Sequence, residues 1–276
     1  MELLIFLFIL ILLISLRYNW WRIPQSYKKA RILMYHSISE HVGNEKHNKW
    51  RVKAQDFEKQ MNWFYKNNWK SFTISELVKL DKIPEKSFVI TFDDGYEDNY
   101  LNAFPILQKY NFKATIYLVP NQKTNHWEEK NTSVLSNLLN EKQILEMQNS
   151  GLIEFGSHTL SHVNLSTIND EQLLNELKKS KEEVEKITNK ECEAFAYPYG
   201  KFDDKIVQAV KTAQYKNATV VKRGLFEQND DVFTIKRVGI LGTESFVDFL
   251  LKVSRVRNKL WLKPLFISFV KMKKNI

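Results

Sequence analysis

Cysteine is almost absent from this chain: Cys192 is the single one among 276 residues. An internal disulfide needs two thiols, so none can form, and the count leaves the redox compartment open. Glycine and proline are also scarce, with 8 and 6 residues, which excludes fibrous and low-complexity classes. We find no repeat and no helix-turn-helix, zinc-finger or RNA-binding signature, so we expect no nucleic-acid partner.

The charge is unbalanced, with a formal net charge of +9 and a pI of about 9.3. A basic chain of this kind favours an anionic membrane surface or an acidic ligand once nucleic acid is set aside. Hydrophobic residues make up 43% of the chain, enough for a sizeable core. The length predicts one large domain or two small ones.

The longest hydrophobic run covers residues 3–16 and is interrupted only by Ser15. It lacks the basic start and the small-residue cleavage site of a signal peptide. Counted through Trp21, it reaches the roughly 20 residues that a membrane span needs, with Arg17 and Arg22 at its end. The sequence predicts a single-pass membrane anchor over residues 1–23. The positive-inside rule favours a cytoplasmic domain, but single N-terminal anchors often break it, so the side of the membrane stays open.

Strand-like and helix-like segments alternate over the next 210 or so residues, as βαβ units do. Expected strands cover 31–35, 87–92, 113–119, 152–155, 194–197, 217–221 and 232–238. Expected helices cover 54–66, 98–110, 141–150, 170–188 and 203–214. This order predicts an α/β fold with a parallel sheet. Barrels and open sheets of this class carry their active sites at the carboxyl ends of the strands, where polar motifs follow here.

The first of these motifs is ITFDDGY, in which Asp93 and Asp94 end a buried strand. Asp-Gly is a common turn pair, and a turn alone is one interpretation. Two adjacent carboxylates, however, cost free energy unless a cation or a proton lies between them. The pair therefore also indicates a cation site.

The second motif is SHTLSH, which places His158 and His162 four residues apart after another strand. On a helix this spacing brings two imidazoles to one face, as a metal ion requires, although the spacing alone is a frequent coincidence. Two histidines and one carboxylate leave positions open for water and substrate. One aspartate can then bind the cation, while the other acts as base on a water whose pKa the cation lowers towards about 7.

Three motifs in order, TFDDGY, HTLSH and AYPYG, resemble the polysaccharide deacetylases of carbohydrate esterase family 4, the NodB-homology proteins. The resemblance runs from about residue 30 to about residue 240. The early ILMYHSI resembles the branch that contains the poly-β-1,6-N-acetylglucosamine deacetylases. The resemblance implies an irregular (β/α)7-type barrel that hydrolyses the N-acetyl group of amino sugars in a glycan. The catalytic domain is then expected over residues 24–243, with a basic amphipathic extension over 244–276.

The resemblance also implies residue roles. Asp93 matches the general base of the family. Asp94, His158 and His162 match its ligands to a divalent metal, usually zinc. Tyr199 matches the residue whose backbone N–H helps to hold the oxyanion of the reaction.

Two departures from the family pattern concern the groups around the base. Ala196 stands where many members have an arginine that orients the base, and Arg237 is either its replacement or a surface residue. No histidine follows His162, where many members have the acid for the leaving amine. In the branch with the early motif, the early histidine supplies that acid, and here it is His36. The alternative interpretation of His36 is a buried histidine with a structural role.

Weaker candidates complete the expected site. Tyr96, Pro198 and Trp127 are predicted to bind substrate, although Trp127 is equally a packing residue. His41 and His47 are expected to be solvated. The C-terminal extension either lies on an anionic membrane or packs on the barrel. The expected partners are an N-acetylated glycan and a membrane; a lipid-linked sugar substrate and a catalytically decayed carbohydrate-binding protein remain alternatives.

Overall fold

The computed structural model describes residues 1–18 and 24–255. Ser26–Phe246 form one compact unit, and the described residues before and after it belong to a second unit. All eight strands of the described residues lie in the first unit. They are β1 (Arg31–Tyr35), β2 (Lys70–Phe72), β3 (Ser87–Phe92), β4 (Ala114–Leu118), β5 (Ile153–Ser157), β6 (Ala194–Ala196), β7 (Asn217–Arg223) and β8 (Ile235–Gly239).

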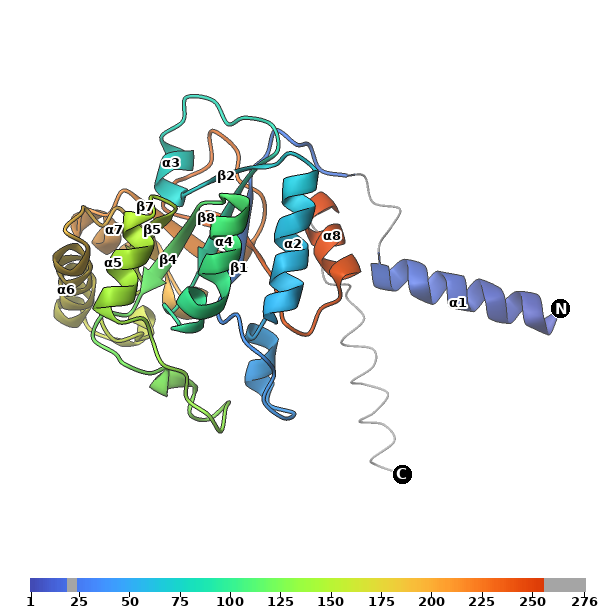
Figure 1. The fold of residues 1–276 in the computed structure, drawn as a ribbon, viewed down its shortest axis with the longest axis horizontal. Coiled ribbons are helices and arrows are strands. Elements are labelled where there is room, and N and C mark those ends of the chain that lie inside the picture. The colour runs from blue at the N-terminus through green and yellow to red at the C-terminus, as the bar shows by residue number, and fades with distance from the viewer. Residues whose placement is uncertain (19–23, 256–276) are drawn as a thin grey trace. The chain divides into compact units, whose positions relative to one another are not determined.

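Seven of these strands close into a parallel barrel (Figure 1). The order β3-β4-β5-β6-β7-β8-β1 returns to its start because β1 pairs with both β8 and β3. The short β2 pairs with Ser87–Val89 at the beginning of β3, and β4 pairs with Ile90–Phe92 at its end. The predicted (β/α)7-type barrel is confirmed, with β2 as an addition outside the ring.

Helices connect the strands and cover the outside of the barrel (Figure 1). They are α2 (Ala54–Lys66), α3 (Ile74–Val78), α4 (Phe104–Tyr110), α5 (Glu141–Asn149), α6 (Asp170–Thr188) and α7 (Asp204–Thr212). Three of them begin with a capping box, in which the N-cap side chain and the third helical residue satisfy each other's backbone N–H groups. No element was predicted for the stretch that forms β2 and α3.

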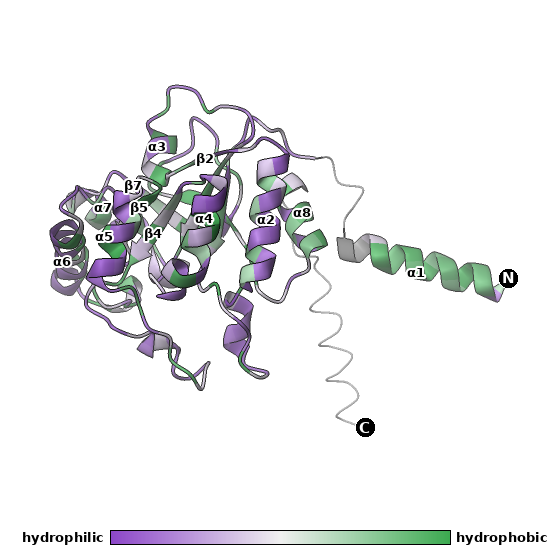
Figure 2. Cartoon of the chain, in the orientation of Figure 1, coloured by the Kyte–Doolittle hydropathy of each residue, from purple (hydrophilic) through white to green (hydrophobic). Residues whose placement is uncertain are grey.

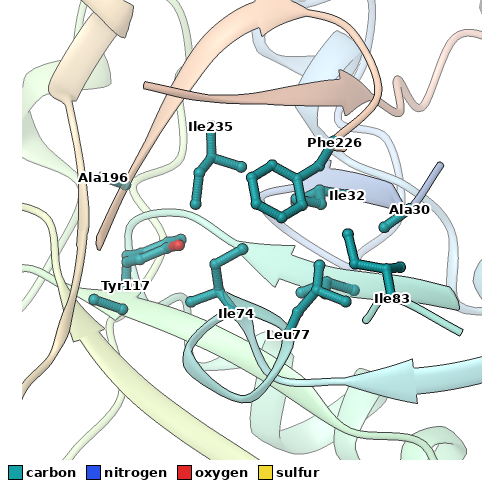
Figure 3. Close-up of a cluster of buried hydrophobic side chains, with 11 residues drawn as sticks. Ala30, Ile32, Ile74, Leu77, Ile83, Tyr117, Ala196, Phe226 and Ile235 are labelled. Carbon is teal, nitrogen blue, oxygen red and sulfur yellow. The ribbon is translucent and has the colours of Figure 1, made fainter. Parts of the chain in front are cut away.

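An apolar cluster fills the barrel near the amino ends of its strands (Figure 3). Ile32 of β1 and Ile235 of β8 meet Ile74 and Leu77 of α3, together with Phe226 from the loop before β8. Burial of each such side chain contributes about 1.5–3 kcal/mol of stability. The sequence motifs with candidate catalytic residues lie at the opposite, carboxyl ends of the strands.

The N-terminal run forms α1 (Glu2–Tyr18), which is apolar along most of its length (Figure 2). Its 17 residues rise about 25 Å at 1.5 Å per residue, less than the roughly 30 Å of a bilayer's hydrocarbon core. Across residues 1–18 and 24–255, no helix is both long and apolar enough to cross a membrane. The predicted transmembrane anchor and membrane location are therefore wrong, and a membrane partner bound through this helix is not supported. The count that reached a full span included Trp20 and Trp21, which lie outside the described residues.

The C-terminal extension begins as a helix, α8 (Phe246–Arg255). Residues 256–276, on which the prediction of a basic amphipathic surface mostly rested, lie outside the described part of the chain.

Candidate active site

One cavity of about 360 Å³ opens at the carboxyl ends of the barrel strands. Each of the sequence motifs contributes to its lining from the end of a different strand. His36 follows β1, Asp93 and Asp94 follow β3, His158 follows β5, and Tyr199 lies just beyond β6. The barrel therefore brings His36 and Tyr199, which are 163 positions apart in the sequence, to the same cavity.

The turn after β3 separates the two aspartates. Asp94 and Gly95 both have left-handed backbones, with φ of 74° and 71°, which bends the chain sharply after Asp93. A Cβ on Gly95 would lie 2.9 Å from the flexible end of Leu118, but it is the left-handed backbone that favours glycine here. The two carboxylates consequently face different partners.

Asp93 faces Arg237, which is 1% exposed and therefore not a surface residue. The guanidinium donates two hydrogen bonds to the carboxylate, from Nη1 at 2.6 Å and from Nη2 at 2.8 Å. The same guanidinium donates to Thr91 Oγ1 and to the Val220 carbonyl. Arg237 thus makes the contact with Asp93 that Ala196, which has no polar side chain, cannot make.

The electrostatic balance at Asp93 favours the charged carboxylate. Burial raises the pKa of Asp93 and is the largest single influence, but Arg237 and the nearby histidines together outweigh it, so the pKa ends below its ordinary value. Asp93 is therefore ionised at neutral pH and can accept a proton.

Asp94 faces the two histidines instead. Its Oδ1 lies 3.5 Å from His158 Nε2 and 3.2 Å from His162 Nε2, and all three residues are buried. His158 Nδ1 lies 2.7 Å from the Ala196 carbonyl. Because that carbonyl can only accept, the proton belongs on Nδ1, and the Nε2 lone pair points towards Asp94.

This arrangement fits a divalent cation. Asp94 Oδ1 is buried without a hydrogen-bond partner, and His158 offers it a lone pair rather than a proton. Burial lowers the pKa of His158 to about 4, so this histidine is neutral at pH 7, as a metal ligand must be. The candidate ligand atoms all lie within 4.8 Å of one another.

The two histidines do not share a helix, so this part of the sequence interpretation is wrong. The segment after β5 is an irregular loop in which Thr159 and His162 have left-handed backbones, with φ of 68° and 58°. The loop nevertheless brings the two rings to a centroid distance of 4.9 Å.

His36 lies on the cavity wall beside the base, with Nε2 4.0 Å from Asp93 Oδ2. This separation is too long for a hydrogen bond. The His36 ring packs against the Trp50 ring, with 4.3 Å between the ring centroids. The backbone carbonyl of His36 accepts a hydrogen bond from Asn99 Nδ2. Burial lowers the pKa of His36.

The three residues predicted to bind substrate are not among those that line the cavity. Tyr96 is fully buried, and Trp127 stacks flat on the His162 ring at 4.2 Å. Pro198 is buried before Tyr199, whose backbone is left-handed at φ 58° and whose hydroxyl lies 3.1 Å from His162 Nδ1. Their direct contact with substrate stays a prediction.

His47 was expected to be solvated, and this expectation is wrong. The side chain is 1% exposed, lines the cavity, and places Nδ1 3.2 Å from Glu128 Oε2. His41, by contrast, is only partly covered, and its Nε2 lies 3.1 Å from the Arg51 carbonyl. Nothing local in the sequence pairs residue 47 with residue 128, because both lie in polar loops.

Comparisons with known proteins agree with this geometry. The polysaccharide deacetylase family model matches residues 81–218. YxkH of Bacillus subtilis, whose name assigns it provisionally to polysaccharide deacetylation, is 31% identical over 224 residues, 80% of this chain and 74% of that protein. The poly-β-1,6-N-acetyl-D-glucosamine N-deacetylase of Staphylococcus aureus is 29% identical over 235 residues, covering 81% and 78%.

Solved structures show the same fold. A polysaccharide deacetylase from Bacillus cereus superimposes with a TM-score of 0.71 at 32% identity, over 83% of this chain and 69% of that one. A Streptococcus pyogenes deacetylase in complex with acetate superimposes with a TM-score of 0.68 at 26% identity, over 82% and 98%.

Proposed function

Because the chain belongs to the polysaccharide deacetylase family and is a hydrolase of carbon–nitrogen bonds, we propose that it removes the acetyl group from N-acetylated amino sugars of a glycan. The observation that carries the proposal is the cavity in which an Arg237-bound Asp93 lies beside Asp94, His158 and His162. The similarity to the Staphylococcus aureus deacetylase favours an N-acetylglucosamine polymer. We assign the catalytic domain to residues 24–243.

Asp94, His158 and His162 would hold the metal ion, and their mixture of nitrogen and oxygen donors suits zinc. When bound, such a cation supplies Lewis acidity that polarises the acetyl carbonyl and makes a water molecule more acidic. The hydrogen bond from His158 to the Ala196 carbonyl fixes the tautomer that this ligand set requires.

Asp93 acts as the general base. Its carboxylate is buried, ionised and fixed in orientation by the two hydrogen bonds from Arg237. A fixed carboxylate at the cavity wall takes the proton of the attacking water without first having to be ordered. Arg237 is a positioning residue, since it acts through Asp93.

His36 supplies the proton that the departing amine needs. It is the histidine on the cavity wall that lies closest to Asp93 among the described ion-pair contacts, and the Trp50 ring and the Asn99 side chain hold it in place. Amide hydrolysis stalls without such an acid, because an unprotonated amine is a poor leaving group.

Tyr199 donates its backbone N–H to the negative charge that develops on the acetyl oxygen. The residues behind the cavity shape this part of the site. Pro198 restricts the backbone that presents Tyr199, and Trp127 holds the His162 ring. Tyr96, two residues after Asp94, is buried with Val119 and Leu138.

Each alternative to this function loses one of its two supports. A lipid-linked substrate was favoured by a membrane anchor and a basic surface, and the anchor is not supported. A decayed enzyme was favoured by the missing motif arginine and the missing late histidine, but Arg237 contacts the base.

The test is acetate release by the full-length protein loaded with zinc. Oligomers of N-acetylglucosamine with β-1,4 and with β-1,6 linkages are offered beside an Asp93→Asn variant. We expect release by the unmodified protein and its loss in the variant, whose fold and zinc content are checked in parallel. Folded, zinc-loaded protein that releases no acetate from either oligomer would overturn a neutral N-acetylglucosamine polymer as the substrate.

A further inference from the structure

Two lysines stand at the cavity on one short helix. The 3-10 helix η1 (Lys46–Trp50) carries Lys46 and Lys49, and side chains three residues apart project from the same side of a 3-10 helix. Both side chains line the cavity that holds Asp93 and Asp94, and both are exposed to solvent. The site therefore has a cationic edge that the deacetylation chemistry above does not use.

The acidic groups of this edge are already bound to other partners. Glu45 lies 3.0 Å from Arg51 Nη1 and accepts hydrogen bonds from Thr132 and from Ser133. Glu128 Oε2 lies 3.2 Å from His47 Nδ1 and accepts a hydrogen bond from Asn131. Throughout residues 24–255, neither lysine ammonium forms an ion pair; that of Lys49 lies over the Trp50 ring, 4.7 Å from its centroid. The positive charge is left for a ligand.

The backbone that presents the lysines is fixed. Arg51, 2% exposed, ties η1 to the opposite loop through Thr132 Oγ1 at 2.9 Å. His47 is bound to the same loop by its side chain and by its backbone N–H, which donates to the Asn131 carbonyl. The Lys49 carbonyl accepts a hydrogen bond from the Gly242 N–H. The two lysines thus project from a backbone that hydrogen bonds hold in place, rather than from a free loop.

The remaining charges of the cavity do not offset this edge. Asp93 is paired with Arg237, and Asp94 faces His158, His162 and, under the proposed function, a cation. A neutral N-acetylated sugar offers these two ammonium groups only hydroxyl and carbonyl oxygens, whereas a carboxylate or a phosphate gains charge-assisted hydrogen bonds. A cationic edge also attracts oppositely charged ligands.

We propose that the substrate of this enzyme carries an anionic group close to the N-acetylated sugar, and that Lys46 and Lys49 bind it. The inference rests on the proposed deacetylase function and deepens it, because it names the glycan as anionic. The shared chemistry is a carboxylate or a phosphate, carried by a neighbouring sugar of the same chain. Lys46 and Lys49 are then specificity-determining residues.

The experiment compares acetate release from three probes by the full-length, zinc-loaded protein. The probes are a neutral N-acetylglucosamine oligomer, an oligomer in which alternate sugars carry a lactyl carboxylate, and a neutral oligomer substituted with glycerol phosphate. We expect kcat/KM to be several-fold higher for one or both anionic probes, and the preferred one identifies the anion. High salt should reduce the advantage, since exposed charges are screened.

Lys46→Gln and Lys49→Gln are measured with the same probes, beside Lys66→Gln at an exposed lysine of α2 that does not line the cavity. We expect each cavity variant to raise KM for the anionic probe by roughly two- to fivefold, the range for exposed charge pairs. The effect should fall on KM rather than on kcat, because the interaction exists before and during the reaction, and it should be smaller with the neutral oligomer. Lys46→Gln is the cleaner variant, since Lys49 also touches Trp50.

The outcomes separate the two proposals. Equal kcat/KM for neutral and anionic probes, with no response to Lys46→Gln, would overturn the anionic-substrate inference and leave the deacetylase intact. A neutral probe that releases acetate while the anionic probes do not would also overturn it. Failure of all three probes with folded, zinc-loaded protein would count against the deacetylase itself.

Discussion

Arg237 on β8 holds both carboxylate oxygens of Asp93, a residue 144 positions earlier in the chain, at 2.6 and 2.8 Å. Both side chains are buried inside the barrel. The planar guanidinium matches the carboxylate as a lysine would not. One contact therefore both neutralises a buried charge and fixes the direction of the proposed base.

Replacing Arg237 by glutamine should reduce stability and activity together. Removing one partner of a buried pair leaves the other charge uncompensated, which costs about 3–5 kcal/mol. We expect that loss in the free energy of unfolding, measured with urea, and a strong fall in kcat. Lys236→Gln on the same strand, where side chains alternate in direction, is the matched control. Unfolding curves that coincide for Arg237→Gln and the unmodified protein would contradict the role of this pair.

Removing either histidine ligand should abolish zinc binding. His158→Ala and His162→Ala are expected to lose the metal and all acetate release, while Asp93→Asn keeps the metal and loses only activity. Elemental analysis of dialysed protein measures the bound zinc. Because a ligand that binds only the folded state stabilises it by about 2.7 kcal/mol at 100 times its Kd, chelation should also lower the melting temperature. Full zinc content in both alanine variants would refute this ligand set.

Loss of His36 should affect the chemistry and spare the metal. An acid in this position contributes about 10²–10⁴-fold to the rate, so His36→Gln should lower kcat by a factor in that range at unchanged zinc content. His126→Gln, at an exposed histidine of the loop after β4, is the control. If kcat for His36→Gln stayed within twofold of the unmodified enzyme, the leaving amine must take its proton elsewhere.

The buried Asp98 should make stability depend on pH. Burial raises its pKa to about 6, although Ser37, the Ile38 N–H and Asn99 donate hydrogen bonds to it. Between about pH 4, where the unfolded chain releases this proton, and about pH 6, the folded chain still holds it. Stability therefore falls as pH rises through this window, by up to about 3 kcal/mol, and the loss is complete above it.

Asp98→Asn removes this ionisation and can keep the hydrogen bonds to Ile38 and Ser37. Its unfolding free energy relative to the unmodified protein should rise from about pH 4 to about pH 7, measured by urea titration at both values. Asp81→Asn, at an exposed aspartate, controls for general charge effects. A relative stability that is the same at both pH values would show that Asp98 does not titrate in this range.

Gly242 should tolerate no side chain. A Cβ there would lie 1.7 Å from the Arg51 carbonyl oxygen and 2.8 Å from that of Asn48, and a backbone cannot yield as a side chain does. Gly242→Ala should displace the wall that carries Lys49, with a stability loss of about 1–3 kcal/mol as for other overpacked sites. At Gly239 the new Cβ meets only the flexible end of Met34 at 3.2 Å, so Gly239→Ala should cost much less. Equal melting temperatures for the two variants would contradict the clash.

Local patterns in the sequence predicted much of this molecule. Helix α6 begins and ends where its pattern indicated, because an Asn169 cap, a periodic apolar face and a final asparagine in the left-handed region are all local signals. The strands before Asp93 and His158 were predicted from short apolar runs, and their parallel order followed from the helices between them. The candidate ligands were found because polar motifs at strand ends mark the active edge of such folds.

Contacts between distant residues were decided only by the tertiary structure. Closure of the barrel through β1 and β3 brings Arg237 to Asp93 and His47 to Glu128, and no local pattern carries either pairing. The spacing of His158 and His162 suggested a helix, but the segment that carries them is a loop with left-handed backbone positions. The N-terminal run suggested a span when it was counted through Trp21, but the described helix covers Glu2–Tyr18. Sequence thus determined where strands end and which chemistry follows them, since both depend on neighbouring residues. Packing determined which of those groups meet, since that depends on how the sheet closes.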